Sequence, residues 1–152
     1  MSTRLDPRSK KAIQKFEGLN KLTRFAVERA SFFSGRDLVK NTSNEILKKN
    51  KRGKLYMIKT KSGRTRRHRA SAPEQTHANI TGATRRSLSF KVQGYELEFG
   101  YGVDKGDATE QAEFLENGTS KMEARPSLFN GIKSSRKQIA NNLEREIGRS
   151  LL

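Results

Sequence analysis

Residues 113–129 of this chain read EFLENGTSKMEARPSLF, and they join the expected end of one helix to the expected start of another. Residues 108–116 predict a short helix that stops at Asn117 and Gly118, because glycine readily takes the left-handed conformation that follows many helices. Pro126 suits the first position of the next helix, where a backbone N–H is not needed. The last helix is predicted to be amphipathic, with one apolar stripe. This stripe consists of Leu128, Ile132, Ile139, Leu143, Ile147 and Leu151.

The N-terminal third of the chain also predicts helix. Asp6 and Pro7 favour a helix start, and Gly18 is expected to end that first segment. From residue 19 to residue 49, apolar side chains recur mostly at three- and four-residue steps, as one face of a helix requires. Gly35 is expected to break or kink this long helix.

The middle of the chain predicts two pairs of strands. Residues 54–60 and 64–70 flank the turn Lys61-Ser62-Gly63 and should form a β-hairpin. Residues 88–92 and 95–101 alternate apolar and polar side chains, which is typical of two antiparallel strands.

Between these pairs, residues 71–82 lack either periodicity and are expected to form a loop that crosses the surface. Tyr95, Phe99 and Tyr101 alternate along the last strand, so we expect them to pack in the core.

The fold class is therefore α+β: a long N-terminal helix and a C-terminal amphipathic helix packed on a small antiparallel sheet, with a projecting basic hairpin. No composition shift divides the chain, and residues 1–152 are expected to form one domain. Residues 1–17 would be an N-terminal arm, and residues 51–70 the hairpin extension.

The composition predicts a thin core and an acidic partner. Hydrophobic residues are only 32% of the chain and charged residues also reach 32%, so much of the chain should lie on solvated or contact surfaces. The net charge of +16 attracts polyanions and opposes a compact monomer. Cysteine is absent, which excludes thiol chemistry and disulfides.

The basic charge is densest between residues 51 and 69, where no acidic residue occurs. Adjacent strand residues such as Arg66 and Arg67 face opposite sides, so both faces of the hairpin should be basic. Three interpretations remain open: docking on an acidic protein, contact with DNA, and plain solvation. Tyr56 is the only aromatic residue there, which argues against sequence-specific binding of nucleic acid. The candidate contact residues are Lys51, Arg52, Lys54, Lys59, Lys61, Arg64, Arg66, Arg67 and Arg69.

No catalytic residue, metal site or cofactor is predicted. His68 and His77 have no other metal ligand at a suitable spacing. Glu110, Glu113 and Glu116 fit a solvated helix face. No apolar stretch approaches the about 20 residues needed to span a bilayer, and no signal peptide is recognised. We expect a protein without enzymatic activity or membrane contact that is made in the cytoplasm.

Two motifs resemble the head–tail joining family of long-tailed bacteriophages, whose members are also called neck, tail-completion or minor tail proteins. The first is the opening stretch, which is similar to the family pattern EFGTSKMPARPFL. The second runs from Arg69-Ala-Ser-Ala-Pro73 through Thr81-Gly82 to Arg85-Arg86-Ser87-Leu88. The departures from the family patterns are Ile80, Ala83-Thr84, Asn117 and Glu123. Residues that match the family are Thr81, Gly82, Arg85, Arg86, Glu116, Gly118, Thr119, Ser120, Lys121, Met122, Ala124, Arg125 and Pro126.

The resemblance implies a structural virion protein of the phage neck, assembled in the host cytoplasm. Copies would form a ring, with six favoured, that joins a head-closure or connector protein to a tail terminator or tail tube protein. Double-stranded DNA would pass through the lumen. The alternative function is a small, nonspecific nucleic-acid-binding protein that uses the basic hairpin.

Overall fold

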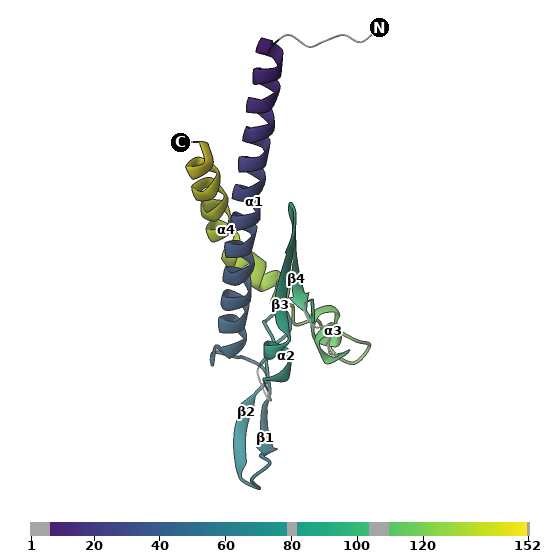
Figure 1. Ribbon diagram of the computed structural model, residues 1–152. Coiled ribbons are helices and arrows are strands. Elements are labelled where there is room, and N and C mark those ends of the chain that lie inside the picture. Colours follow the sequence, from purple (N-terminus) through teal and green to yellow (C-terminus); the bar gives the residue numbers. More distant parts are fainter. Residues whose placement is uncertain (1–6, 79–81, 104–109, 152) are drawn as a thin grey trace.

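The fold is α+β, as the sequence predicts, and a long helix forms its spine (Figure 1). The computed structural model describes residues 7–78, 82–103 and 110–151. The helices are α1 (Pro7–Leu47), α2 (Ala83–Arg86), α3 (Glu110–Asn117) and α4 (Ser127–Leu151). The strands are β1 (Leu55–Lys59), β2 (Thr65–Arg69), β3 (Leu88–Gln93) and β4 (Glu96–Tyr101).

Helix α1 is continuous over 41 residues, which at about 1.5 Å per residue is a rod of roughly 60 Å. The predicted stop at Gly18 and the predicted break at Gly35 are therefore both wrong. A side chain at Gly35 would overlap the ring of Phe90 on β3, so this glycine lets the sheet approach the helix and does not interrupt it. The first turns of α1 include residues 7–17, which we expected in a separate arm; residues 1–6 lie outside the described part of the chain.

Helix α4 packs antiparallel along the C-terminal half of α1, and this is the largest contact between elements (Figure 1). The buried stripe of α1 repeats every four residues, the spacing of a ridge that fits a groove on a partner helix. It consists of Ala26, Ala30, Ser34, Leu38, Thr42 and Ile46.

The face that α4 buries differs from the predicted apolar stripe. Its buried residues are small or polar: Ser127, Gly131, Ser135, Asn142 and Glu146. Ile132 of the predicted stripe is exposed, and Leu128, Ile139, Leu143 and Ile147 are only half-buried. We call the contact between α1 and α4 the seam. Small side chains are buried there because they let the two helix backbones approach closely, as where Gly131 lies against Thr42.

Hydrogen bonds replace apolar burial along this seam. Asn142 donates to Asp37 Oδ2 over 3.0 Å, and Asn41 donates to Ser135 Oγ over 2.9 Å. Such bonds each add about 0.5–1.5 kcal/mol net. Among the described residues the buried hydrophobic set holds only six side chains, which agrees with the expected thin core.

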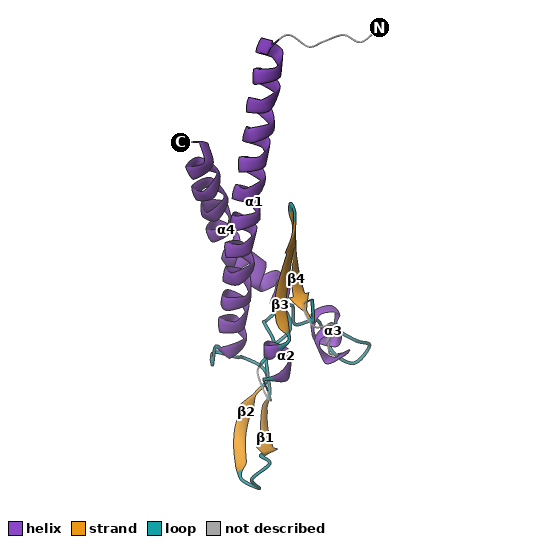
Figure 2. Cartoon of the chain, in the orientation of Figure 1, coloured by secondary structure: helices purple, strands orange, loops and turns teal. Residues whose placement is uncertain are grey.

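Two separate antiparallel pairs form the β structure (Figure 2). Strands β3 and β4 pair from Leu88 with Tyr101 to Gln93 with Glu96, and this sheet packs on α1. The ring of Phe90 meets that of Phe32 edge-on at 5.6 Å between centroids. Tyr95, expected in the core, lies in the turn before β4 and is exposed.

The loop after β2 differs from the expected surface crossing. Ser71, Thr76 and His77 in it are buried, and residues 79–81 lie outside the described part of the chain. Helix α2, a single turn after the left-handed Gly82, was not predicted. No helix that the structure describes is long and apolar enough to cross a membrane.

Candidate interaction surface around the basic hairpin

The β1–β2 hairpin projects from one end of the molecule, as predicted (Figure 1). Its register runs from Leu55 opposite Arg69 to Lys59 opposite Thr65. Gly63 takes the positive φ of 76° that the turn requires. Four of five residues in each strand are exposed, and Ile58 and His68, on one face, are half-buried, so the described part of the chain fully covers neither face of this two-stranded sheet. An isolated hairpin of this kind is marginally stable in water, which indicates a surface suited to a partner.

Eight of the nine predicted basic contact residues are exposed. They lie on the approach to the hairpin, on its strands and around its turn: Arg52, Lys54, Lys59, Lys61, Arg64, Arg66, Arg67 and Arg69. Both faces of the hairpin therefore carry positive charge, as the alternation predicts.

Lys51 is the exception, because it is buried. Its ammonium group donates to the carbonyl oxygens of Glu45 at 3.0 Å and Thr76 at 2.9 Å. Burial lowers the pKa of Lys51, although the charge of Glu45 opposes this. Lys51 thus ties the end of α1 to the loop after β2 and is not placed to contact a partner.

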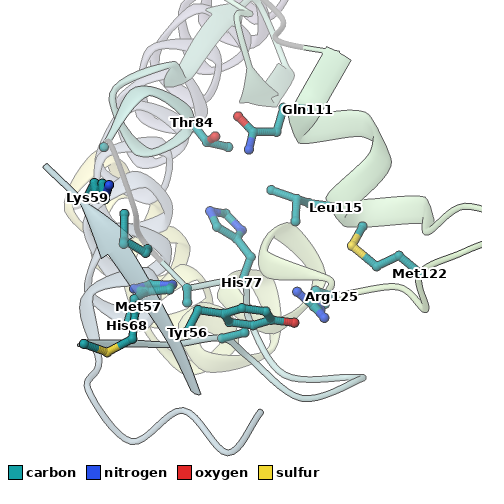
Figure 3. Close-up of a pocket in the computed structure, with 14 residues that line it drawn as sticks. Tyr56, Met57, Lys59, His68, His77, Thr84, Gln111, Leu115, Met122 and Arg125 are labelled. Carbon is teal, nitrogen blue, oxygen red and sulfur yellow. The ribbon is translucent and has the colours of Figure 1, made fainter. Parts of the chain in front are cut away.

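An open groove of about 690 Å³ separates the hairpin from α3 and the turn that follows it (Figure 3). Met57 lines it on the hairpin side, and Leu115 and Met122 line it on the other. Lys59 and Arg125 add positive charge to the same groove. Its surface is thus apolar with a cationic border, a feature that the sequence did not indicate because it joins segments about 60 residues apart.

His77 lies at the back of this groove, between its two sides (Figure 3). Its Nδ1 is 3.2 Å from Ser127 Oγ, and its ring is 6.4 Å from that of Tyr101. Burial, followed by the charges of Lys51 and Arg125, lowers the pKa of His77 to about 4. The ring is therefore neutral at pH 7. His68 is on the hairpin, where burial and then Arg66 lower its pKa.

Glu116 caps helix α4, which corrects the prediction of a solvated side chain. Its Oε1 accepts the backbone N–H groups of Ser127 at 2.8 Å and Leu128 at 3.0 Å, and it also accepts from the Ser127 hydroxyl. A carboxylate there satisfies N–H groups that have no partner within the helix and complements the positive end of its dipole. Tyr101 donates to the same carboxylate over 3.5 Å and also contacts Ser127 Oγ. Burial is the main cause that raises the pKa of Tyr101.

The family-like stretch forms a tight turn between α3 and α4. Gly118 has φ of 77° and its N–H bonds the carbonyl of Phe114 at 2.9 Å, which ends α3 as predicted. Thr119 and Met122 exchange backbone bonds of 2.7 and 3.2 Å, and Arg125 N–H donates to Leu115 at 2.7 Å. Pro126 directly precedes α4.

Other residues of the motifs border this turn. Ser120 and Lys121 are exposed on it, and the carbonyl of Ala124 accepts from Glu74 at 3.1 Å. In the second motif, Gly82 precedes α2, Arg85 donates to Ser43 Oγ at 3.3 Å and Arg86 is exposed; Thr81 lies outside the described residues. The motifs thus set how the elements join.

In the described ranges, no three His, Asp or Glu side chains lie close enough together to bind a metal ion. Glu110 and Glu113 lie exposed on α3, as expected. Comparison with known proteins gives no family assignment: no family model, curated protein or solved structure matches this chain.

Proposed function

We propose that this protein is a structural subunit of a phage neck, which assembles as a ring between a head-closure or connector protein and a tail terminator or tail tube protein. The proposal rests on the resemblance of the motifs around Gly82 and residues 113–129. The observation that supports it best is the projecting hairpin, with neither face fully covered by the described part of the chain and positive charge on both. A surface of this kind gains stability when a neighbouring subunit covers it.

Exposed apolar side chains on the hairpin and the helices support self-association as well. Met57 on β1 and Phe129 on α4 are each 65% exposed. On α1, Leu22, Phe25 and Phe32 are about half exposed, and their spacing places them on one side of the helix. Apolar side chains grouped in this way mark contact surfaces more often than solvated ones.

The residues buried between α1 and α4 are consistent with apolar side chains being left for contacts between subunits. The face that α4 buries is small and polar, and α1 contributes only Leu38 and Ile46 as large apolar residues of its buried stripe, so Phe25, Phe32, Phe129 and Ile132 remain exposed for contacts outside the subunit. A subunit of this kind folds around hydrogen bonds and is expected to gain apolar burial on assembly.

Particle mass and symmetry of the purified protein test the proposal. We expect a closed ring in negative-stain images and a matching mass by light scattering, both without nucleic acid. Amide hydrogen exchange should slow in residues 55–70 when the particle forms, because the hairpin becomes covered. A monomer at every concentration and salt level, with equal hairpin exchange in all samples, would rule out the ring.

The second candidate is nonspecific binding of nucleic acid, favoured by eight exposed basic residues near one hairpin. It predicts that a monomer binds duplex DNA and that affinity falls steeply between about 50 and 200 mM salt as counterions are no longer released favourably. Ring formation without DNA, combined with weak DNA affinity in a non-assembling variant, would count against it.

A further inference from the structure

The face of α3 that points away from the hairpin is acidic, and no part of the chain that the structure describes covers Glu110 or Glu113 on it. A cleft of about 420 Å³ lies along it, and Glu110, Glu113 and Glu116 line that cleft. Ala112 and Leu128 give it apolar surface. Glu116 is held there as the cap of α4, while Glu110 and Glu113 are exposed. The cleft thus combines an apolar lining with carboxylates, which suits the aliphatic stem and charged end of a lysine or arginine.

Helix α3 lies between this acidic cleft and the groove beside its own hairpin. Gln111 and Leu115, four residues apart, face the hairpin groove. Glu110, Glu113 and Asn117 follow steps of three and four residues and face the acidic cleft. At about 100° per residue these two sets are on nearly opposite sides of the helix. The hairpin of the same subunit lies on the opposite side of α3 and therefore does not reach the acidic cleft.

The tip of the hairpin is built to present cations outward. Thr60 N–H donates to Arg64 at 2.8 Å, and Gly63 N–H donates to Thr60 at 2.9 Å, which closes the turn. The Thr60 hydroxyl adds a 2.9 Å bond to the Arg64 carbonyl. These bonds fix the backbone, while the side chains of Lys61 and Arg64 are exposed on either side of Gly63. A preorganised turn loses little entropy when it docks.

We propose that the hairpin tip of one subunit, through Lys61 and Arg64, docks in the Glu110–Glu113 cleft of a second copy of this chain. This inference rests on the proposed self-assembly and names the surface that receives the hairpin. Because donor and acceptor are different surfaces of each subunit, the contact is head-to-tail and repeats from copy to copy. Such a contact closes into a ring or continues as a filament, depending on the rotation between neighbours.

Two charge-reversal variants test the contact. K61E/R64E gives an acidic tip beside a natural acidic cleft, and E110K/E113K gives a basic cleft beside a natural basic tip. Each variant alone should assemble about a hundredfold more weakly than the unmodified protein, since facing like charges costs several kcal/mol. The measurement is light scattering or sedimentation against protein concentration, at low and moderate salt.

An equal mixture of the two variants provides the decisive measurement. The acidic tip of one then meets the basic cleft of the other, and the remaining tip and cleft keep their natural charges. We expect assembly to return only in the mixture, with both chains at a 1:1 ratio. Recovery also demonstrates that each variant is folded, which a loss of assembly alone does not.

The outcomes separate this inference from the proposed function. If the unmodified protein is monomeric, self-assembly fails and the inference fails with it. If the unmodified protein forms rings and E110K/E113K forms them equally well, or the mixture stays monomeric, another surface receives the hairpin and only the inference is overturned. E17K/E144K is the matched control: it changes the net charge equally at exposed helical positions and should leave assembly within about twofold, as expected for scattered surface charges.

Discussion

Two regions of the molecule are rich in polar groups: the seam between α1 and α4, and the β1–β2 hairpin. In the seam the polar groups bond to one another, whereas in the hairpin they are exposed to solvent. In the seam, the carboxylate of Glu146 is buried and lies 3.3 Å from Arg29, 3.0 Å from Arg145 and 3.4 Å from Arg149. The hydrogen bond from Arg145, with the charges of all three arginines, lowers the pKa of Glu146. The hairpin has no acidic residue of its own between residues 51 and 69. The buried carboxylate of the body thus meets its cations within the subunit, whereas the basic side chains of the hairpin are mostly exposed and have no carboxylate in their own segment.

The comparison predicts that substitutions in the body change folding, whereas substitutions in the hairpin change assembly. Gly131→Val should have the largest effect, because a side chain there overlaps Thr42 and separates the two helices. We expect a loss of about 3 kcal/mol in the free energy of unfolding, measured by urea denaturation. Gly148→Ala on the same helix is the control. Nothing lies within 4 Å of that position, so it should be neutral or stabilising by up to about 1 kcal/mol.

Acid should destabilise the body through His77. Its folded pKa of about 4 lies below the ordinary value of 6.5, so the unfolded chain binds more protons between these values. The stability is complete above pH 6.5 and is lost as the pH falls towards 4. We expect a loss of about 2 kcal/mol between pH 7 and pH 5.

His77→Gln tests this assignment, because it removes the titrating group. The difference in unfolding free energy between pH 7 and pH 5 should largely disappear in His77→Gln. It should persist in His68→Gln, because His77 still titrates in that variant. An unchanged pH dependence in His77→Gln would assign the effect to other groups.

Glu116→Gln should weaken the junction between α3 and α4 by about 1–2 kcal/mol, because a neutral amide accepts the N–H bonds of α4 less strongly. Thermal unfolding at low protein concentration measures this. Glu113→Gln changes the same charge on the same helix but caps nothing in the described structure, so it should stay within about 0.5 kcal/mol of the unmodified protein. Equal losses in both would contradict the cap.

Met57→Ser should have the smallest effect on folding, below about 0.5 kcal/mol, because the side chain is already exposed in the single subunit. Its effect on assembly should be larger than its effect on folding. Comparing the urea midpoint with the concentration required for assembly sharpens the contrast between the two regions. A large shift of the urea midpoint would show instead that the hairpin belongs to the folded body.

Local patterns along the chain were sufficient for most of the secondary structure. Alternation predicted β3 and β4, the turn at Gly63 predicted β1 and β2, Gly118 predicted a helix end, and the run of basic residues predicted an exposed hairpin. These features depend on backbone conformation and on charge density within a few residues, so neighbours in the sequence carry the information. At Gly35, packing against Phe90 outweighs the weak helix propensity of glycine. Gly18 is exposed with nothing within 4 Å, so there the helix simply tolerates a glycine, at a cost of about 1 kcal/mol relative to alanine.

Tertiary structure alone decided which side chains became partners. Helix α4 buries small or polar residues against α1 and leaves its predicted apolar stripe partly exposed, because the close approach of two backbones depends on side-chain size at the crossing. Lys51 and Glu116 look like ordinary surface charges in the sequence. In the fold, Lys51 is buried and donates to the carbonyl oxygens of Glu45 and Thr76, and Glu116 caps α4 by accepting its first N–H groups. The groove beside the hairpin and the cleft on the far side of α3 likewise exist only after segments far apart in sequence have packed together.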